Sequence, residues 1–162
     1  MKRPKFLLFL IMILPWFTLP FLGGKTIKRF LPAAIFISMV SKIIDIIAGK
    51  RNWWKYYTTI HPLLKGSAPL VLGPFLASAF WSLKNTYGKF VSYIISNLLL
   101  HVAFATIGMR ILKRLRITSL DKMNRVQLVF VLLFRALVLY GFQFTKESIE
   151  KRRNKQMLTR NY

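Results

Sequence analysis

Long apolar runs separated by short basic clusters dominate the chain. Five such runs cover residues 6–23, 30–49, 67–83, 90–109 and 126–144. The first of them would be roughly 27 Å long as a helix, close to the hydrocarbon thickness of a bilayer, about 30 Å. No run alternates as a barrel strand does, and a helix satisfies its backbone hydrogen bonds internally in lipid. The pattern predicts an all-α integral membrane protein of one domain, a bundle of about five transmembrane helices with short basic loops.

The charge balance narrows the choice of partner. The chain has 26 Lys and Arg against four Asp and Glu, a formal net charge of +22, although 54% of its residues are hydrophobic. Such an excess is typical of proteins that bind nucleic acid or an anionic membrane surface. Because the basic residues stand between apolar runs and not on one polar face, we expect the lipid bilayer and its anionic headgroups as partners, and no nucleic acid. A membrane-protein partner or a homo-oligomer fits the same pattern.

The run 30–49 differs from the other predicted spans because it contains two charged residues, Lys42 and Asp45. A central charge costs about 2.5–3.5 kcal/mol to insert, whereas each Leu, Ile, Phe or Val returns about 0.3–0.6 kcal/mol. The apolar residues of this run therefore return roughly 3–6 kcal/mol, about what the two charges cost. Insertion requires partners for these charges.

Pro69 and the pair Gly73-Pro74 interrupt the third run. Broken helices line substrate sites in some transporters. However, Gly73 and Ala77 form a pair of small residues four positions apart, which suits close contact between helices. We interpret the interruption as a packing kink, with a substrate-lining break as the alternative.

Polar side chains recur at helical spacing inside three of the runs. They are Ser38, Lys42 and Asp45 on the second, Tyr93, Asn97 and His101 on the fourth, and Gln127, Arg135 and Gln143 on the fifth. Charged groups at this depth normally face protein and pair with one another. Asp45 is the only acidic residue inside a predicted span, so Arg135 and Lys42 compete for it. Arg135 has the advantage, because its planar fork can bind a carboxylate through two parallel hydrogen bonds.

The sequence thus predicts an intramembrane polar cluster whose three charged members are buried. Its residues are Lys42, Asp45, Asn97, His101 and Arg135. One interpretation is that the cluster locks the helices together through hydrogen bonds of about 0.6 kcal/mol each. The alternative is a polar pathway or small anion pocket, with Arg135 as the charge and His101 as a proton carrier.

Enzymatic activity is the least supported alternative. The chain has no Gly-x-Ser-x-Gly, Walker, His-Glu-x-x-His or Gly-x-Gly-x-x-Gly motif. Its two histidines stand 40 positions apart, and cysteine is absent. We therefore expect no catalytic residues, no metal site and no cofactor. No residues support the hypothesis of an enzyme that acts on a lipid headgroup.

Basic residues gather in two loops, 50–66 and 110–125, and the first of them also contains aromatic residues. Trp and Tyr favour the headgroup level of a bilayer, and Lys and Arg favour the anionic phosphates just above it. This predicts a contact surface for anionic lipid made of Lys50, Arg51, Trp53, Trp54, Lys55, Arg110, Lys113, Arg114 and Arg116.

The distribution of basic residues also suggests an orientation. With five spans, the amino terminus and both basic loops share one side, which holds 13 basic residues against 11 on the other. The positive-inside rule then places that side in the cytoplasm. We expect the tail 145–162 to be an exposed helix end that frays. If the fifth run re-entered the membrane without crossing it, this tail would also be cytoplasmic.

The chain resembles the small, uncharacterised multi-span membrane proteins of Bacillus-type bacteria. The features shared with them are the lysine-tipped first span 1–24, the stretch Lys50-Arg51-Asn52-Trp53-Trp54-Lys55 and the interrupted segment Gly73-Pro74-Phe75. The resemblance implies a multi-pass protein of the plasma membrane and assigns no activity. Together the patterns favour a structural or accessory membrane component that binds partner helices and anionic lipid. The alternative is a small-ion or small-solute transporter or channel that uses the Asp–Arg–His cluster.

Overall fold

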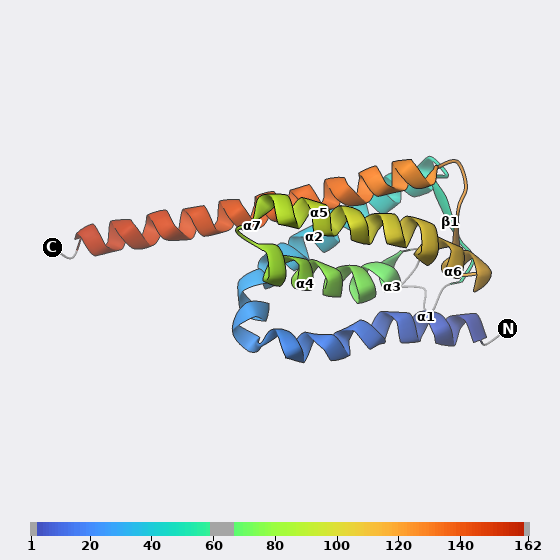
Figure 1. Ribbon diagram of the computed structural model, residues 1–162, viewed down its shortest axis with the longest axis horizontal. Helices are drawn as coiled ribbons and strands as arrows, with labels where there is room; N and C mark the ends of the chain where they lie inside the picture. The colour runs from blue at the N-terminus through green and yellow to red at the C-terminus, as the bar shows by residue number, and fades with distance from the viewer. Residues whose placement is uncertain (1–2, 59–66, 161–162) are drawn as a thin grey trace.

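The computed structural model describes residues 3–58 and 67–160, and these form five helical rods (Figure 1). Two rods are single helices, and the other three contain a 3₁₀ or π turn. In chain order the rods are α1 (Arg3–Ile13) with η1 (Leu14–Leu22); α2 (Gly24–Lys50); α3 (Ala68–Leu70) with η3 (Val71–Phe75) and α4 (Leu76–Thr86); α5 (Phe90–Ala103) with η4 (Phe104–Gly108) and α6 (Met109–Arg114); and α7 (Arg125–Arg160). The predicted helical fold is confirmed.

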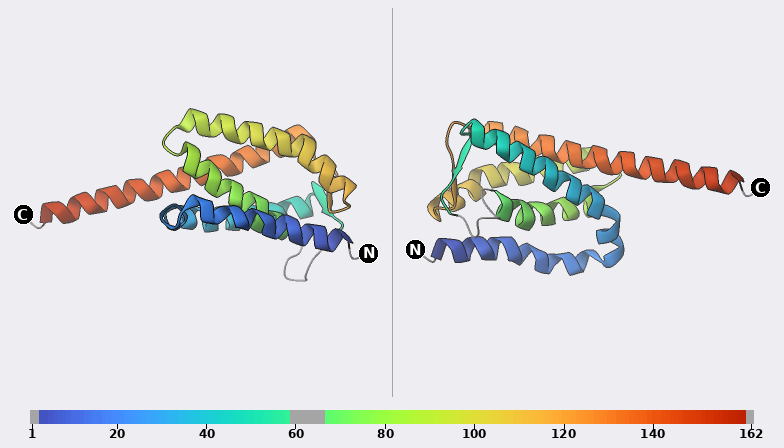
Figure 2. Two further views of the ribbon diagram at one scale, coloured as in Figure 1. Left: turned by 60° about the horizontal axis from the view of Figure 1, so that its bottom comes forward. Right: turned by 180° about the vertical axis from the view of Figure 1, so that it is seen from behind.

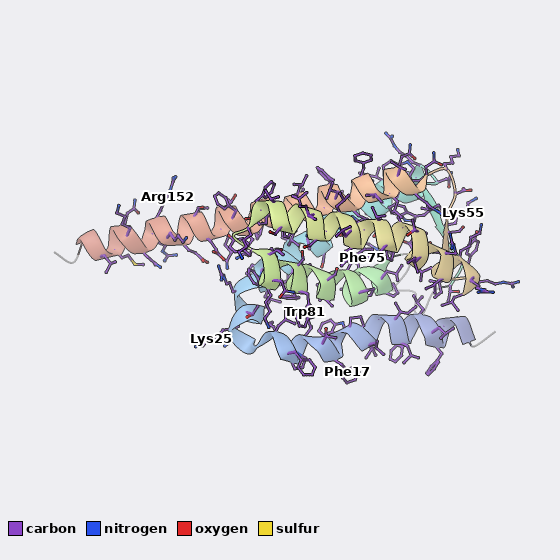
Figure 3. The ribbon with its side chains drawn as sticks, in the orientation of Figure 1. Phe17, Lys25, Lys55, Phe75, Trp81 and Arg152 are labelled. Atoms are coloured by element: carbon purple, nitrogen blue, oxygen red, sulfur yellow. The ribbon has the colours of Figure 1, made fainter. Side chains whose placement is uncertain are left out.

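Successive rods run in opposite directions, so the bundle has two distinct ends (Figures 1 and 2). The start of α1, the end of α6 and two short strands lie at one end, which we call the ribbon end. The connections α1/η1–α2 and α4–α5 lie at the other, the tail end, beyond which α7 projects. Lys55 and Lys25 mark these opposite ends in Figure 3.

The rod of α3, η3 and α4 is the central one. It contacts α1 and η1 on one side, and α2, α5 and α7 on others. Ala77, Phe80 and Leu83 of α4 are buried in this core. A helix enclosed by other helices has little surface to present to lipid, so it can carry more small and polar residues than an outer one.

Length and composition distinguish this central rod from the other four. Among the described residues, four helices are long and apolar enough to cross a membrane: Lys5–Leu22, Gly24–Lys50, Phe90–Arg114 and Arg125–Leu158. The rod 68–86, which covers all but the first residue of the third predicted span, is not one of them.

Large apolar side chains point outward from the four outer rods. Phe17 and Phe21 are 72% and 78% exposed, and Phe17 points away from the bundle in Figure 3. Other outward-facing members are Met39, Ile43, Val91, Leu99, Ile107, Val126, Phe130 and Phe134. Soluble monomers rarely expose large apolar patches, and so many exposed apolar side chains favour a membrane or partner contact.

Gly73 provides a close contact between the central rod and α1. A Cβ atom at this position would lie 2.6 Å from the Cα of Met12, and 2.8 and 2.9 Å from the carbonyl oxygens of Met12 and Ile11. The neighbouring Pro74 lacks an N–H, and the helix passes through the π turn η3 at this point. This contact supports the interpretation of Gly73-Pro74 as a packing kink.

Two helices extend well beyond the predicted spans. Helix α2 begins at Gly24, not at residue 30, and α7 continues to Arg160. The predicted tail is thus a helix end, and residues 151–158 of it are exposed. The carboxylate of Glu147, within the predicted tail, accepts hydrogen bonds from Nε and Nη2 of Arg29 at 2.6 and 2.8 Å. Gln143 also donates to Glu147, at 2.6 Å. These contacts fix the first turns of the tail against α2.

An antiparallel ribbon joins the two basic loops, which the sequence did not predict. Strand β1 (Trp54–Tyr56) pairs with β2 (Thr118–Leu120), with Lys55 opposite Ser119. The Nζ of Lys55 lies 2.8 Å from Oδ2 of Asp121, and this carboxylate raises the pKa of Lys55. The segment predicted to lie at the interface is therefore held to the 110–125 loop, whereas residues 59–66 lie outside the described residues.

Candidate functional site

Asp45 and Arg135 form an ion pair between α2 and α7. Nη2 of Arg135 lies 3.6 Å from Oδ1 of Asp45, and each side chain is only 10% exposed. These two helices pack directly on each other, which brings their polar stripes together. The prediction that Arg135 and not Lys42 pairs with Asp45 is confirmed.

Polar groups from the ribbon end complete the surroundings of Asp45. The hydroxyl of Ser67 donates to Oδ2 of Asp45. Tyr56 of β1 lies beside Ser67 and Asp45, and its burial, with the nearby carboxylate, raises the pKa of its phenol. The phenol therefore stays protonated and can donate a hydrogen bond at this site.

The ion pair leaves much of its hydrogen-bonding capacity unused. At 3.6 Å, the contact between the two side chains is too long for a hydrogen bond. Oδ1 of Asp45 and both Nε and Nη2 of Arg135 are buried without a hydrogen-bond partner among the described residues. A buried ion pair stabilises a protein only when its geometry is good and its remaining polar atoms are satisfied. This pair meets neither condition.

His101 is the least satisfied polar side chain of the cluster. It is 6% exposed on α5, and neither ring nitrogen has a partner among the described residues. The Leu132 carbonyl lies near the ring without making a hydrogen bond of acceptable geometry. His101 is therefore expected to destabilise the fold, because an unpaired buried polar group lowers the unfolding free energy by about 1–3 kcal/mol.

Asn97, in contrast, is satisfied. Its Nδ2 donates to Oγ of Ser82 at 2.6 Å and to the carbonyl of Tyr93 at 2.8 Å. The hydroxyl of Tyr93 in turn donates to the Ala136 carbonyl at 2.8 Å. These bonds join α4, α5 and α7, so this half of the α5 stripe acts as an interhelical lock.

Among the described residues, Arg135 lines two small cavities. The first, of about 50 Å³, is lined by polar side chains from four rods, including Ser38, Ser78, Asn97 and His101. The second, of about 30 Å³, lies toward the ribbon end and is lined by Asp45, Tyr56 and Ser67. Arg135, Leu132 and Phe75 line both, and Figure 3 shows Phe75 at the centre of the bundle. One water needs roughly 10–15 Å³ of cavity volume, so the first cavity has room for a few waters or a small ion.

Two wider grooves extend the site to the surface. They have volumes of about 230 and 240 Å³, and Lys42, Asp45 and Ser67 line both. Asp45 and Ser67 also line the second small cavity. The polar residues thus form a continuous series from His101 at the centre to a surface groove between α2 and α3.

Lys42 occupies a different place from the one predicted. It is exposed at the rim of these grooves, so the prediction of three buried charges is wrong for this residue. Arg135 already compensates the only carboxylate available, and burying a second cation beside it would leave one charge unpaired. Gln127 also lies outside the cluster, because its carboxamide accepts a hydrogen bond from the Asn124 N–H before α7.

The predicted lipid-contact residues all lie at the ribbon end. Seven are exposed, namely Lys50, Arg51, Lys55, Arg110, Lys113, Arg114 and Arg116, whereas Trp53 and Trp54 are half-buried. The guanidinium of Arg51 lies 5.9 Å from the Trp53 ring centroid. The β1–β2 ribbon therefore gathers basic groups from loops about 60 residues apart into one surface.

Sequence reasoning missed a second charged cluster, at the tail end. Besides Arg29, Gln143 and Glu147, it contains Tyr87, over which the Arg29 guanidinium stacks at 5.2 Å. Burial and the neighbouring Glu147 raise the pKa of Tyr87 to about 12. The sequence contained one signal for this cluster. With only four acidic residues against 26 basic ones, each acidic residue is expected to pair with a cation.

The described residues contain no group of three His, Cys, Asp or Glu side chains that could hold a metal ion. His61, the other histidine, lies outside the described residues. No family model, curated protein or solved structure matches the chain.

Proposed function

We propose that the chain is a multi-pass protein of the bacterial plasma membrane, with its amino terminus and ribbon end in the cytoplasm. The outward-facing apolar side chains of the four outer rods support insertion. The basic surface at the ribbon end supports the orientation, since basic loops remain in the cytoplasm. The alternating rods would then place the projecting end of α7 on the opposite side.

Cysteine labelling tests this orientation. The chain has no cysteine, so a single introduced thiol reports its own position. We expect a membrane-impermeant maleimide to label Lys25→Cys in intact cells, because Lys25 lies at the tail end. Lys55→Cys should react only after permeabilisation. Labelling of Lys55→Cys in intact cells would reverse the proposed orientation, and equal labelling of both would contradict insertion.

We also propose that the polar site binds and conducts a small ion. The observation that carries this proposal is the set of buried, unpartnered polar atoms of His101 and Arg135. They lie at cavities that share lining residues with a surface groove. A cluster that only locked helices would pair these atoms, as Asn97 and Tyr93 are paired. Because the cavities have room for only a few waters, a proton or a small anion suits them better than a larger solute.

Replacing His101 by leucine separates conduction from structure. If His101 only held the fold, the change would destabilise it. Because its nitrogens have no partners, we expect His101→Leu to unfold in detergent with a free energy unchanged or higher by about 1–3 kcal/mol. Ion flux in proteoliposomes should meanwhile fall to that of protein-free vesicles.

Proton flux is measured with a trapped pH-sensitive dye, and chloride flux with a chloride-sensitive one. Thr106→Val is the matched control on the same rod, since Thr106 bonds only carbonyls of its own helix. It should keep wild-type flux. Wild-type flux in His101→Leu would contradict the proposal, as would a wild-type protein that conducts neither ion.

The second candidate is an accessory component that holds anionic lipid and partner helices. The basic ribbon-end surface supports it, because that surface lies apart from the polar cavities. Under this function, His101→Leu would have no effect on the role of the protein.

A further inference from the structure

The two surface grooves meet at Lys42, Asp45 and Ser67. One continues along Ser38 and α3, and the other runs past Gly49 to Trp54 and Tyr56 of β1. The combined hollow therefore extends from the side of α2 to the aromatic residues of the ribbon end.

Lys42 stands among apolar side chains that face outward. Met39, Ile43 and Ile46 around it are 63%, 58% and 53% exposed. Eight residues separate Lys42 from Lys50 at the end of α2, which corresponds to about 12 Å along the helix. In the proposed membrane, this lysine lies beside acyl chains and extends its ammonium group toward the headgroup level.

The other charges of the groove are already compensated. Asp45 pairs with Arg135 and accepts from Ser67, whereas Lys42 makes no salt bridge with a described residue. Because the charges of Asp45 and Arg135 cancel, the net charge at the groove is the single positive charge of Lys42. A cation at this depth needs an anion that can reach it from the bilayer.

We propose that this groove binds the anionic headgroup of a membrane phospholipid, with the Lys42 ammonium paired to its phosphate. The acyl chains then lie along the apolar face of Met39, Ile43 and Ile46. Trp54 and Tyr56 contact the glycerol region, where amphipathic aromatic side chains are favoured. A lipid delivers its phosphate to this depth without desolvating a free anion, because the bilayer carries the rest of the molecule. This inference rests on the proposed membrane location but not on ion conduction.

Native mass spectrometry of the purified full chain tests the proposal. Detergent-solubilised protein is titrated with phosphatidylglycerol or phosphatidylcholine, and the bound fractions are compared. We expect wild-type protein to prefer phosphatidylglycerol. Lys42→Gln should reduce this preference about fivefold, the factor that one lysine contributes beside anionic lipid. Lys42→Arg, which keeps the charge, should retain it.

Lys28→Gln is the matched control, because Lys28 is also exposed on α2 but lies at the tail end. It should leave the preference unchanged. Circular dichroism confirms that each variant is folded. An unchanged preference in Lys42→Gln, or an equal loss in Lys28→Gln, would overturn the site. Displacement of phosphatidylglycerol by millimolar inorganic phosphate would overturn the choice of lipid and indicate a soluble anion. A wild-type protein that prefers phosphatidylglycerol but conducts neither protons nor chloride would contradict only the proposed conduction.

Discussion

Replacing Asp45 by leucine is expected to cost about 3–5 kcal/mol of unfolding free energy, because it leaves the Arg135 guanidinium buried without a counter-charge. Arginine remains protonated in proteins, so this charge cannot be removed by titration. Arg135→Leu instead leaves the Asp45 carboxylate without a partner, and this carboxylate can take up a proton and become neutral. We therefore expect Arg135→Leu to be the less destabilising of the two single variants.

The double variant Asp45→Leu with Arg135→Leu should recover most of this loss. A buried ion pair with unsatisfied polar atoms contributes little net stability, and apolar replacement of both partners is often neutral or stabilising by about 1–4 kcal/mol. Unfolding in mixed detergent micelles, followed by circular dichroism, gives the four free energies of the cycle. Lys42→Leu serves as the control, since an exposed side chain without an ion pair should change stability by at most about 0.5 kcal/mol. Additive losses in the double variant would show that the two side chains are not coupled.

The charge exchange Asp45→Arg with Arg135→Asp asks a separate question. If the pair is structural and close in space, as its 3.6 Å contact indicates, the exchange should restore expression lost in either single variant. Failure of every exchange would count against the pair.

The ion pair was predictable because the chain offers so few alternatives. Asp45 is the only acid within a predicted span, and a buried carboxylate needs a cation. The exposure of Lys42 was not predictable in the same way. Helical spacing places Ser38, Lys42 and Asp45 on one broad face, but only the packing of α7 determines which part of that face is buried.

Long-range contacts explain most of what the sequence did not reveal. The β1–β2 ribbon joins strands of three residues each, too short to show a pattern, across a separation of about 60 positions. The contact between Arg29 and Glu147 spans 118 positions. It holds the start of the tail against α2, which hydropathy cannot predict, since hydropathy marks where a helix contacts lipid and not which polar side chains pair.

The second large effect is expected at Gly73, where α1 and the central rod are in contact through their backbones. An alanine Cβ here would lie 2.6 Å from the Met12 Cα, a distance that real Cβ atoms do not tolerate. We expect Gly73→Ala to lower the unfolding free energy by about 1–3 kcal/mol, the usual cost of overpacking, and Gly73→Val to lower it further. Gly49→Ala is the matched control, because it is also helical but has nothing within 4 Å of its added Cβ. That change should stabilise the protein by about 0.5–1 kcal/mol, since alanine favours a helix over glycine.

A suppressor test identifies the backbone as the source of the clash. At Gly108, the atom nearest to an added Cβ belongs to the Phe104 ring, at 2.8 Å, so Gly108→Ala should be tolerated or rescued by Phe104→Leu. At Gly73, the three nearest atoms are backbone atoms of Ile11 and Met12, so shortening Met12 to alanine should rescue nothing. Rescue of Gly73→Ala by Met12→Ala would mean that a side chain sets the distance between these rods. Its absence would mean that α1 can approach the central rod this closely only because position 73 has no side chain.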